Sequence, residues 1–268
     1  LELDTFSAQI DELSTASGID LRLHGTESDD ETIKDTAVAQ PLLVASAIAC
    51  AAELGISPAV VAGHSVGEIA AAQIAGIFTP ADAMAFVKVR ADGMAAAAAA
   101  TPTGMSAVVG GQPEDVLAAI EAAGASPANV NGGGQTVAAG SLEALEALAE
   151  NPPERARVIS LAVAGAFHTE FMASATADLS AAASAMEVSD PTVSILSNSD
   201  GTSVETGREY VDRLVKQVTN PVRWDLCQES LLNTGITGMI ELVPGGTLTG
   251  IARRAMKGVE TFAIKSAA

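Results

Sequence analysis

The segment Gly63-His64-Ser65-Val66-Gly67 places a serine between two glycines in the pattern G-x-S-x-G. In many enzymes this pattern forms a sharp turn between a strand and a helix and exposes the serine hydroxyl as a nucleophile. An apolar run over residues 59–62 precedes the turn, and a helix-like run over 68–75 follows it. Side chains at the two flanking positions would collide with neighbouring backbone, so we expect both glycines to be required. The pattern predicts Ser65 as a nucleophile; the alternative is an ordinary tight turn.

A serine nucleophile requires a general base, and histidine is the usual one. The chain contains three histidines. His64 adjoins Ser65, but at such a turn its side chain points away from the hydroxyl. His24 lies in a polar segment, where a surface role is expected. His168 follows an apolar run over residues 158–166 and is the remaining candidate, with a purely structural histidine as the alternative.

An acidic residue often orients the histidine in such sites. Asp82, Asp92 and Asp115 lie between Ser65 and His168, where hydrolases with this turn carry the acid. The sequence does not select among them, and a group other than a carboxylate stays open.

Arg90 lies among apolar residues of a predicted helix. From the residues alone, the favoured interpretation is a surface arginine whose aliphatic side-chain carbons are partly covered by neighbouring residues. The alternative is an arginine that binds a substrate carboxylate through two hydrogen bonds.

The composition limits the possible partners. With 33 acidic and 14 basic residues the net charge is −19, which argues against nucleic acid and against an anionic membrane surface. Cys50 and Cys227 lie in apolar stretches and are expected to be buried thiols. The scattered histidines and cysteines show no metal-ligand spacing, and the apolar runs look shorter than a membrane span. We therefore expect a cytoplasmic protein with no metal and no membrane partner.

Strand-like and helix-like segments alternate along most of the chain, which predicts an α/β fold with a parallel sheet. Residues 102–166 instead follow the order β-α-β-β-α-β, which predicts an inserted ferredoxin-like subdomain. The large domain is then 1–101 and 167–268. In it we expect helices over 1–16, 41–54, 68–75, 80–100, 170–186, 208–219, 223–233 and 247–257, and strands over 59–62, 192–197, 238–243 and 260–265.

Several segments together resemble the malonyl-CoA:acyl-carrier-protein transacylase family, in the style of its actinobacterial members. The similarity covers essentially the whole chain, and the spacings between the segments agree. The segments are Ala39-Gln40-Pro41-Leu42, Gly63-His64-Ser65-Val66-Gly67-Glu68, Val89-Arg90, Thr103-Gly104-Met105-Ser106-Ala107-Val108, Gly165-Ala166-Phe167-His168, Asn220-Pro221-Val222-Arg223-Trp224 and Pro244-Gly245-Gly246-Thr247-Leu248-Thr249-Gly250.

The resemblance implies an α/β-hydrolase-like large domain and a ping-pong S-malonyltransferase. Ser65, with His168 as base, would take the malonyl group from malonyl-CoA and pass it to the phosphopantetheine thiol of acyl carrier protein. The main-chain carbonyl of Gln217 would orient His168, and the N–H of Val66 would bind the oxyanion. No cofactor and a monomeric state are expected. The substrate-binding residues implied are Arg90 (for the malonyl carboxylate), Gln40, His64, Phe167 and Asn131.

Two further points concern substrate and activity. Phe167 and Val66 resemble malonyl-selective members, whereas methylmalonyl-selective relatives tend to have Ser and Gln there; excluding one methyl is worth only about 1–3 kcal/mol. The family begins with a β-strand and a Gly-Gln-Gly-Ser-Gln loop whose glutamine is a second oxyanion donor, and we expect this segment to be missing here. The alternatives are a polyketide-synthase-type acyltransferase, a serine esterase or thioesterase, and a non-catalytic scaffold.

Overall fold

The computed structural model describes residues 3–266, and two of its long helices end at residues whose chemistry favours helix termini. α6 (Pro80–Ala100), predicted over residues 80–100, begins with a capping box between Thr79 and Asp82 and includes the run of alanines over residues 95–100. α4 (Thr36–Leu54) ends at Gly55, which has a left-handed φ of 55°. We call residues 3–101 and 167–266 the larger lobe and residues 102–166 the smaller lobe. The other helices of the larger lobe are α1 (Asp4–Ser17), α2 (Leu21–Thr26), α3 (Asp30–Lys34), α5 (Gly67–Ile74), the 3-10 helix η1 (Glu170–Ala175), α9 (Thr176–Ala185), α10 (Gly207–Gln217), α11 (Trp224–Asn233) and α12 (Thr247–Ala255).

The parallel strands of the larger lobe form two short sheets. β1 (Val60–Val61) pairs with β6 (Ser194–Ile195), and β8 (Gly238–Glu241) pairs with β9 (Glu260–Ala263). A largely apolar cavity of about 580 Å³ is lined by β1 and β8 together. The predicted α/β class with parallel pairing is confirmed, whereas the expected single parallel sheet is not formed by residues 3–266.

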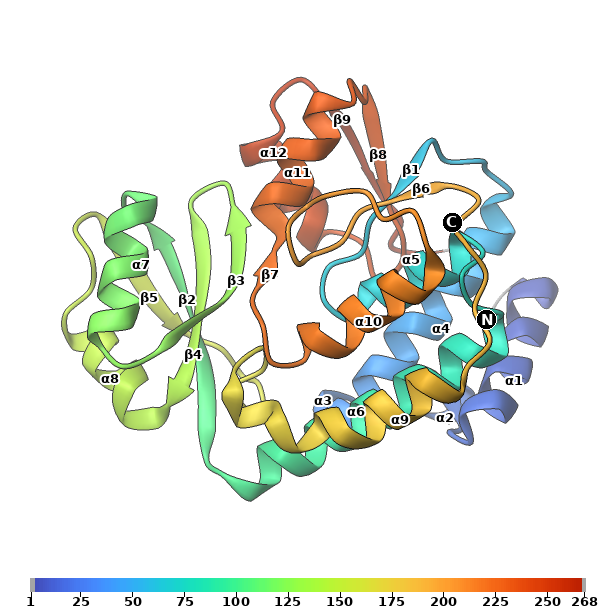
Figure 1. Cartoon of the computed structure of the whole chain (residues 1–268), viewed down its shortest axis with the longest axis horizontal. Coiled ribbons are helices and arrows are strands. Elements are labelled where there is room, and N and C mark those ends of the chain that lie inside the picture. Colours follow the sequence, from blue (N-terminus) through green and yellow to red (C-terminus); the bar gives the residue numbers. More distant parts are fainter. Residues whose placement is uncertain (1–2, 267–268) are drawn as a thin grey trace.

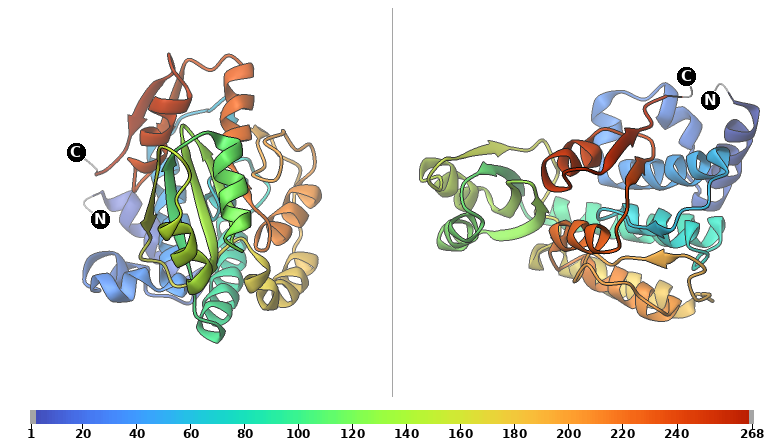
Figure 2. Two further views of the ribbon diagram at one scale, coloured as in Figure 1. Left: turned by 90° about the vertical axis from the view of Figure 1, so that its left-hand side faces the viewer. Right: turned by 90° about the horizontal axis from the view of Figure 1, so that it is seen from above.

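The smaller lobe has its elements in the predicted order, and its sheet continues into the larger lobe (Figures 1 and 2). The strand order is β5-β2-β4-β3-β7; the first four strands are antiparallel, and β7 of the larger lobe adds to β3 in parallel. Side chains of α7 and α8 pack on the sheet face that carries Val108 and Ala138. The opposite face carries Met105 and Val137, which cluster with Ala166 and Phe167 beside the larger lobe. The elements are β2 (Thr103–Gly110), α7 (Pro113–Ala122), β3 (Ser126–Gly132), β4 (Gln135–Ser141), α8 (Leu142–Glu150), β5 (Ala156–Ser160) and β7 (Val222–Arg223).

Some predicted boundaries are wrong. α4 begins at Thr36 rather than residue 41, because the side chain of Asp35 accepts the N–H of Ala37 and starts the helix earlier. At 19 residues, α4 also has the length and mean hydropathy of a membrane span, contrary to the expectation for the apolar runs. It packs against α1, α5 and α6. The helix expected over 170–186 starts as the 3-10 helix η1, the strand expected over 192–197 is reduced to β6, and β7 was not anticipated.

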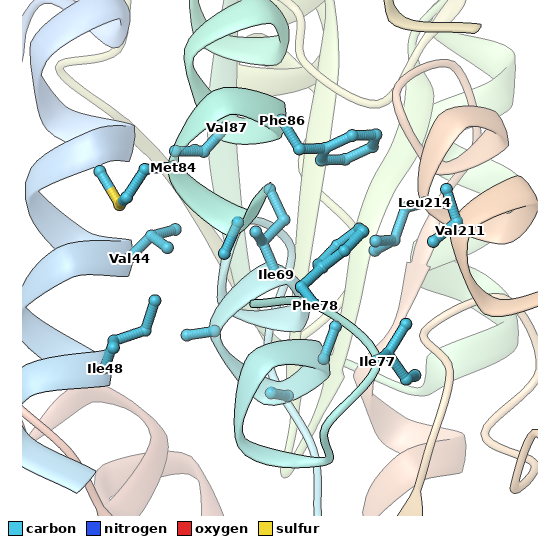
Figure 3. Packing of buried hydrophobic residues seen from close by; sticks show 14 of the residues in the cluster. Val44, Ile48, Ile69, Ile77, Phe78, Met84, Phe86, Val87, Val211 and Leu214 are labelled. Carbon is cyan, nitrogen blue, oxygen red and sulfur yellow. The ribbon is translucent and has the colours of Figure 1, made fainter. Parts of the chain in front are cut away.

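The main core lies between α4, α5, α6 and α10 (Figure 3). α6 is the central helix, since it contacts α1, α4, α5 and α9. The rings of Phe78 and Phe86 lie 5.5 Å apart within this core. Cys50 and Cys227 are buried free thiols, as predicted. The larger core side chains drawn in Figure 3 are Val44, Ile48, Ile69, Ile77, Phe78, Met84, Phe86, Val87, Val211 and Leu214.

Glu241 of β8 fixes the start of α12, and its removal tests how much this cap stabilises the fold. Its carboxylate accepts the backbone N–H groups of Gly246, Leu248 and Thr249, each at 2.8 Å. Burial alone would raise the pKa of Glu241, but these N–H groups hold it below the ordinary value. We expect Glu241→Gln to lower the free energy of unfolding in urea at pH 7 by about 2 kcal/mol. The difference should shrink as the pH falls through the folded-state pKa, since the parent carboxylate is then protonated.

The exposed Glu260 on the neighbouring strand β9 provides the control. Glu260→Gln should change the unfolding free energy by no more than about 0.5 kcal/mol. Equal losses in the two variants would contradict the capping role of Glu241.

Candidate active site

Ser65 lies in a strained turn between β1 and α5. Its φ is 53°, in the left-handed region that non-glycine residues rarely adopt. Gly63 makes the turn possible, because a Cβ at that position would lie 2.0 Å from the carbonyl carbon of Gly67. A Cβ on Gly67 would meet no atom within 4 Å. The predicted steric requirement is therefore confirmed for Gly63 and wrong for Gly67.

A fully buried asparagine, Asn198, clamps this turn from the segment after β6. Its Oδ1 accepts the N–H of Ser65 at 2.7 Å, and its Nδ2 donates to the carbonyl of Gly63 at 2.8 Å. One side chain thus holds the backbone on both sides of His64. No sequence signal pointed to Asn198, because it lies 133 positions from Ser65.

The structure brings Ser65, His168 and Gln217 into hydrogen-bonding contact. The Oγ of Ser65 lies 2.7 Å from Nε2 of His168, and Nδ1 of His168 lies 2.9 Å from the main-chain oxygen of Gln217. A carbonyl oxygen can only accept, so Nδ1 carries the proton and Nε2 is free to accept the proton of Ser65. His168, like Ser65, has a left-handed φ, of 62°. Strained residues of this kind cluster at functional sites.

The three aspartates weighed as orienting acids lie elsewhere. Asp82 belongs to the cap of α6, and Asp92 pairs with Lys88 on the same helix. Asp115 lies in the first turn of α7, in the smaller lobe. The carbonyl of Gln217 occupies the place that an acid would take beside His168.

Burial and charge keep His168 neutral. Burial, and then the positive charge of Arg90, lower the pKa of His168 to about 3, against the opposing hydrogen bond to Gln217. The imidazole is therefore the free base throughout the neutral and mildly acidic range, which is the form that a general base requires.

Arg90 is buried, with 2% of its surface exposed, so the surface interpretation from the residues alone is wrong. Its guanidinium donates through Nη1 to Oε1 of Gln40, and through Nη2 to Oε1 of Gln217 at 2.9 Å. Nη2 also lies 3.4 Å from Oγ of Ser65. Burial lowers the pKa of Arg90 to about 10, against the attraction of Glu68, so the group is charged at neutral pH. A cation thus lies beside Ser65, held there by neutral amide oxygens.

A cavity of about 210 Å³ opens above these groups. Six of the nine predicted site residues line it, and Gln217 lies behind them. Sequence reasoning did not single out Lys34, Thr36, Met94 or the segment 162–164, which also contribute to the lining. The six predicted lining residues are Gln40, Ser65, Val66, Arg90, Phe167 and His168.

His64 and Asn131 do not line this cavity. Nε2 of His64 lies 2.8 Å from Oδ1 of Asn131, and the His64 ring packs edge-on against Trp224. His64 points away from the Ser65 hydroxyl, as expected, and its contact with substrate stays a prediction. In the described part of the chain, the N–H of Val66 at the start of α5 donates no hydrogen bond, so it is available to an oxyanion.

Comparison with known proteins decides the family. Residues 3–267 match the model of the acyl transferase domain. The chain belongs to the acyl transferase domain family. This acyl transferase is 49% identical to the malonyl CoA-acyl carrier protein transacylase of Mycobacterium tuberculosis over 274 residues, which cover 100% of this chain and 91% of that protein. It is also 49% identical to the transacylase of the same name from Mycolicibacterium smegmatis, with 99% and 95% covered.

Solved structures agree with this assignment. The crystal structure of the transacylase MCAT from Mycobacterium tuberculosis superposes with a TM-score of 0.95, covering 100% of this acyl transferase and 90% of that chain. A malonyl-transacylase in complex with its type II polyketide-synthase acyl-carrier protein superposes with a TM-score of 0.90 at 27% identity, covering 98% and 89%.

The two glycines that flank Ser65 make a matched pair for testing the turn. Gly63→Ala should abolish sulfonylation of Ser65 and lower the melting temperature, because its Cβ would overlap the backbone at residue 67. Gly67→Ala should fold with unchanged or slightly higher stability, since the position is open and alanine favours helix. Thermal unfolding and labelling by phenylmethylsulfonyl fluoride measure the two effects. Equal damage from both substitutions would argue against the steric role of Gly63.

The lowered pKa of His168 predicts an unusual pH profile. Sulfonylation of Ser65 by phenylmethylsulfonyl fluoride should proceed at nearly the same rate at pH 5 as at pH 7.5. A histidine with an ordinary pKa would slow the reaction about 30-fold over that interval, because protonation would remove the base. An inflection in the second-order rate constant between pH 6 and 7 would contradict the buried, neutral state of His168.

Proposed function

We propose that this acyl transferase moves the malonyl group from malonyl-CoA to the phosphopantetheine thiol of acyl carrier protein. The observation that carries the proposal is the buried guanidinium of Arg90, 3.4 Å from Oγ of Ser65. A cation in that position, held by amide oxygens rather than by a carboxylate, suits an acyl group that itself ends in a carboxylate. The relatives named as malonyl transacylases support the same substrate.

The first half-reaction forms an ester on Ser65. Nε2 of His168 takes the proton of the Ser65 hydroxyl while Oγ attacks the thioester carbonyl carbon. The oxyanion of the tetrahedral intermediate is stabilised by the N–H of Val66 and by the N-terminus of α5. The carbon–sulfur bond then breaks, His168 returns the proton to the leaving thiolate, and coenzyme A departs.

The second half-reaction reverses these steps with a different thiol. His168 takes the proton of the phosphopantetheine thiol, whose sulfur attacks the malonyl ester. Ser65 leaves with the proton held by His168, and the malonyl thioester remains on the carrier protein. The chain's own residues need supply only a base, a donor for the oxyanion and a cation for the carboxylate, so we propose that no metal or resident cofactor takes part.

We describe the larger lobe as α/β-hydrolase-like because its nucleophile lies in a turn between a parallel strand and a helix. We describe residues 102–166 as ferredoxin-like because of their β-α-β-β-α-β order and antiparallel strand order β5-β2-β4-β3. We also propose that the enzyme acts in the cytoplasm, since Cys50 and Cys227 are free thiols, as is usual in a reducing compartment.

Two features bear on substrate selectivity and rate. Phe167 lines the cavity beside Ser65, where it would restrict a methyl branch on the malonyl group. That restriction is a preference of about 1–3 kcal/mol. The sequence contains no Gly-Gln-Gly-Ser-Gln loop, so Val66 is the oxyanion donor that these 268 residues supply. Removal of a single oxyanion donor typically lowers turnover about 100- to 1000-fold, so the N–H of Val66 bears on the rate.

Intact-protein mass spectrometry after mixing with malonyl-CoA tests the function. We expect a malonyl adduct on the parent chain, none on Ser65→Ala, and loss of the adduct when holo acyl carrier protein is added, with malonyl appearing on the carrier. Arg90→Ala should slow adduct formation about 10-fold or more, since a charge-assisted hydrogen bond is lost. An adduct released to water as malonate, with none on the carrier, would favour an esterase or thioesterase.

A further inference from the structure

Four buried polar side chains beneath the Ser65 turn take no direct part in the proposed acyl transfer chemistry. Glu68, Asn198, Tyr210 and the side chain of Gln217 are each exposed by 4% or less. Oε1 of Glu68 accepts the backbone N–H of Asn198 at 2.7 Å and lies 3.4 Å from the hydroxyl of Tyr210. Oε2 of Glu68 accepts a hydrogen bond from Nε2 of Gln217. The carboxyl group therefore links the turn to the residue that contacts both His168 and Arg90.

Arg90 at one end of this chain of hydrogen bonds and the N–H of Asn198 at the other can only donate, and together they determine which of the groups between them donate and which accept. A guanidinium can only donate, so the oxygen of the Gln217 amide must face Arg90. Nε2 of Gln217 must then donate on its other side. Its shortest contact there is to Oε2 of Glu68, whereas the main-chain oxygen of Ser65 and Oδ1 of Asn198 each lie 3.4 Å away. The N–H of Asn198 is also only a donor, so Glu68 must accept through both of its oxygens.

Protonation of Glu68 does not reverse this order. Burial raises the pKa of Glu68 to about 8, against the hydrogen bonds from its partners and the charge of Arg90. A proton on Oε1 can point to the oxygen of Tyr210, whose own hydroxyl has the carbonyl of Leu196 as another acceptor at 3.4 Å. Oε2 accepts from Gln217 in either state.

We propose that Glu68 is a positioning residue for recognition of the substrate carboxylate: it fixes the side-chain amide of Gln217 so that the amide oxygen, and not the NH₂ group, faces Arg90. Arg90 is then held by two neutral oxygens, from Gln40 and Gln217, and keeps its charge for the acyl group. This inference rests on the proposed function, because it concerns the group that binds the malonyl carboxylate. It adds a residue whose side chain makes no hydrogen bond to Ser65 and acts through Gln217.

Glu68→Gln tests the proposal with a side chain of almost the same shape. The oxygen of the introduced amide would remain on the N–H of Asn198, so the introduced NH₂ group would face Gln217. The Gln217 amide would then turn and present its own NH₂ group to Arg90, donor against donor. We expect the second-order rate constant for malonylation of Ser65 by malonyl-CoA to fall about 10-fold or more. Sulfonylation by phenylmethylsulfonyl fluoride, which has no carboxylate, should change less than about threefold, since Ser65 and His168 are unaltered.

Tyr210→Phe is the matched control. It removes a donor from the same carboxyl group but leaves the contact between Glu68 and Gln217 in place. The ratio of malonylation to sulfonylation rates should therefore equal that of the parent, even where the melting temperature falls. If Glu68→Gln does not fold, Glu68→Asp interrupts the same link, because its carboxylate is one methylene shorter and is withdrawn from Gln217. It should likewise slow malonylation while sparing sulfonylation.

The outcomes separate this inference from the proposed function. Equal loss of both rates in Glu68→Gln, or in Glu68→Asp, would reduce Glu68 to a structural residue and overturn the inference alone. A parent chain that is sulfonylated at Ser65 but never malonylated would overturn the proposed function, and the inference with it. A selective loss of malonylation with an unchanged ratio in Tyr210→Phe is the result that supports both.

Discussion

The site is organised around one buried positive charge. A guanidinium removed from water is costly unless its N–H groups find partners, and Arg90 finds them on three separate elements. Gln40 comes from α4, Gln217 from the end of α10, and Ser65 from the turn before α5. The hydrogen bonds that the Arg90 guanidinium requires therefore fix the relative positions of these elements. The same charge helps to lower the pKa of His168 and opposes the rise in the pKa of Glu68.

The choice of a carbonyl to orient the histidine follows from this charge. A carboxylate beside His168 would also lie close to Arg90 and would compete with any anionic substrate for it. The main-chain oxygen of Gln217 fixes the imidazole tautomer without adding a full negative charge. The side chain of the same residue contacts Arg90 through an uncharged oxygen. Gln217 thus serves both groups and leaves the cavity electrostatically positive, which is a requirement for binding a carboxylate next to a nucleophile.

Features encoded locally were predictable from the sequence, and features that depend on distant partners were not. The G-x-S-x-G turn and the helix α6 each depend on residues adjacent in the sequence, and both were predicted. The burial of Arg90 depends on residues 50 and 127 positions away, so the residues alone favoured the wrong interpretation. The carbonyl of Gln217 carries no signature in residue type, and only the family resemblance pointed to it. Asn198 was missed because its contacts with the turn cross 133 positions. The division of the parallel strands into two pairs likewise depends on tertiary packing rather than on local pattern.

The left-handed backbone at Ser65 also limits which nucleophiles this scaffold can evolve. Threonine carries the same hydroxyl, but a β-branched side chain is a severe outlier at positive φ. Cysteine is unbranched and fits the turn as serine does. A lineage that keeps this turn can therefore exchange oxygen for sulfur in one substitution, whereas a threonine nucleophile would require rebuilding the backbone on both sides of the residue. The backbone geometry at Ser65 thus also restricts which residue types can serve as the nucleophile in later members of this family.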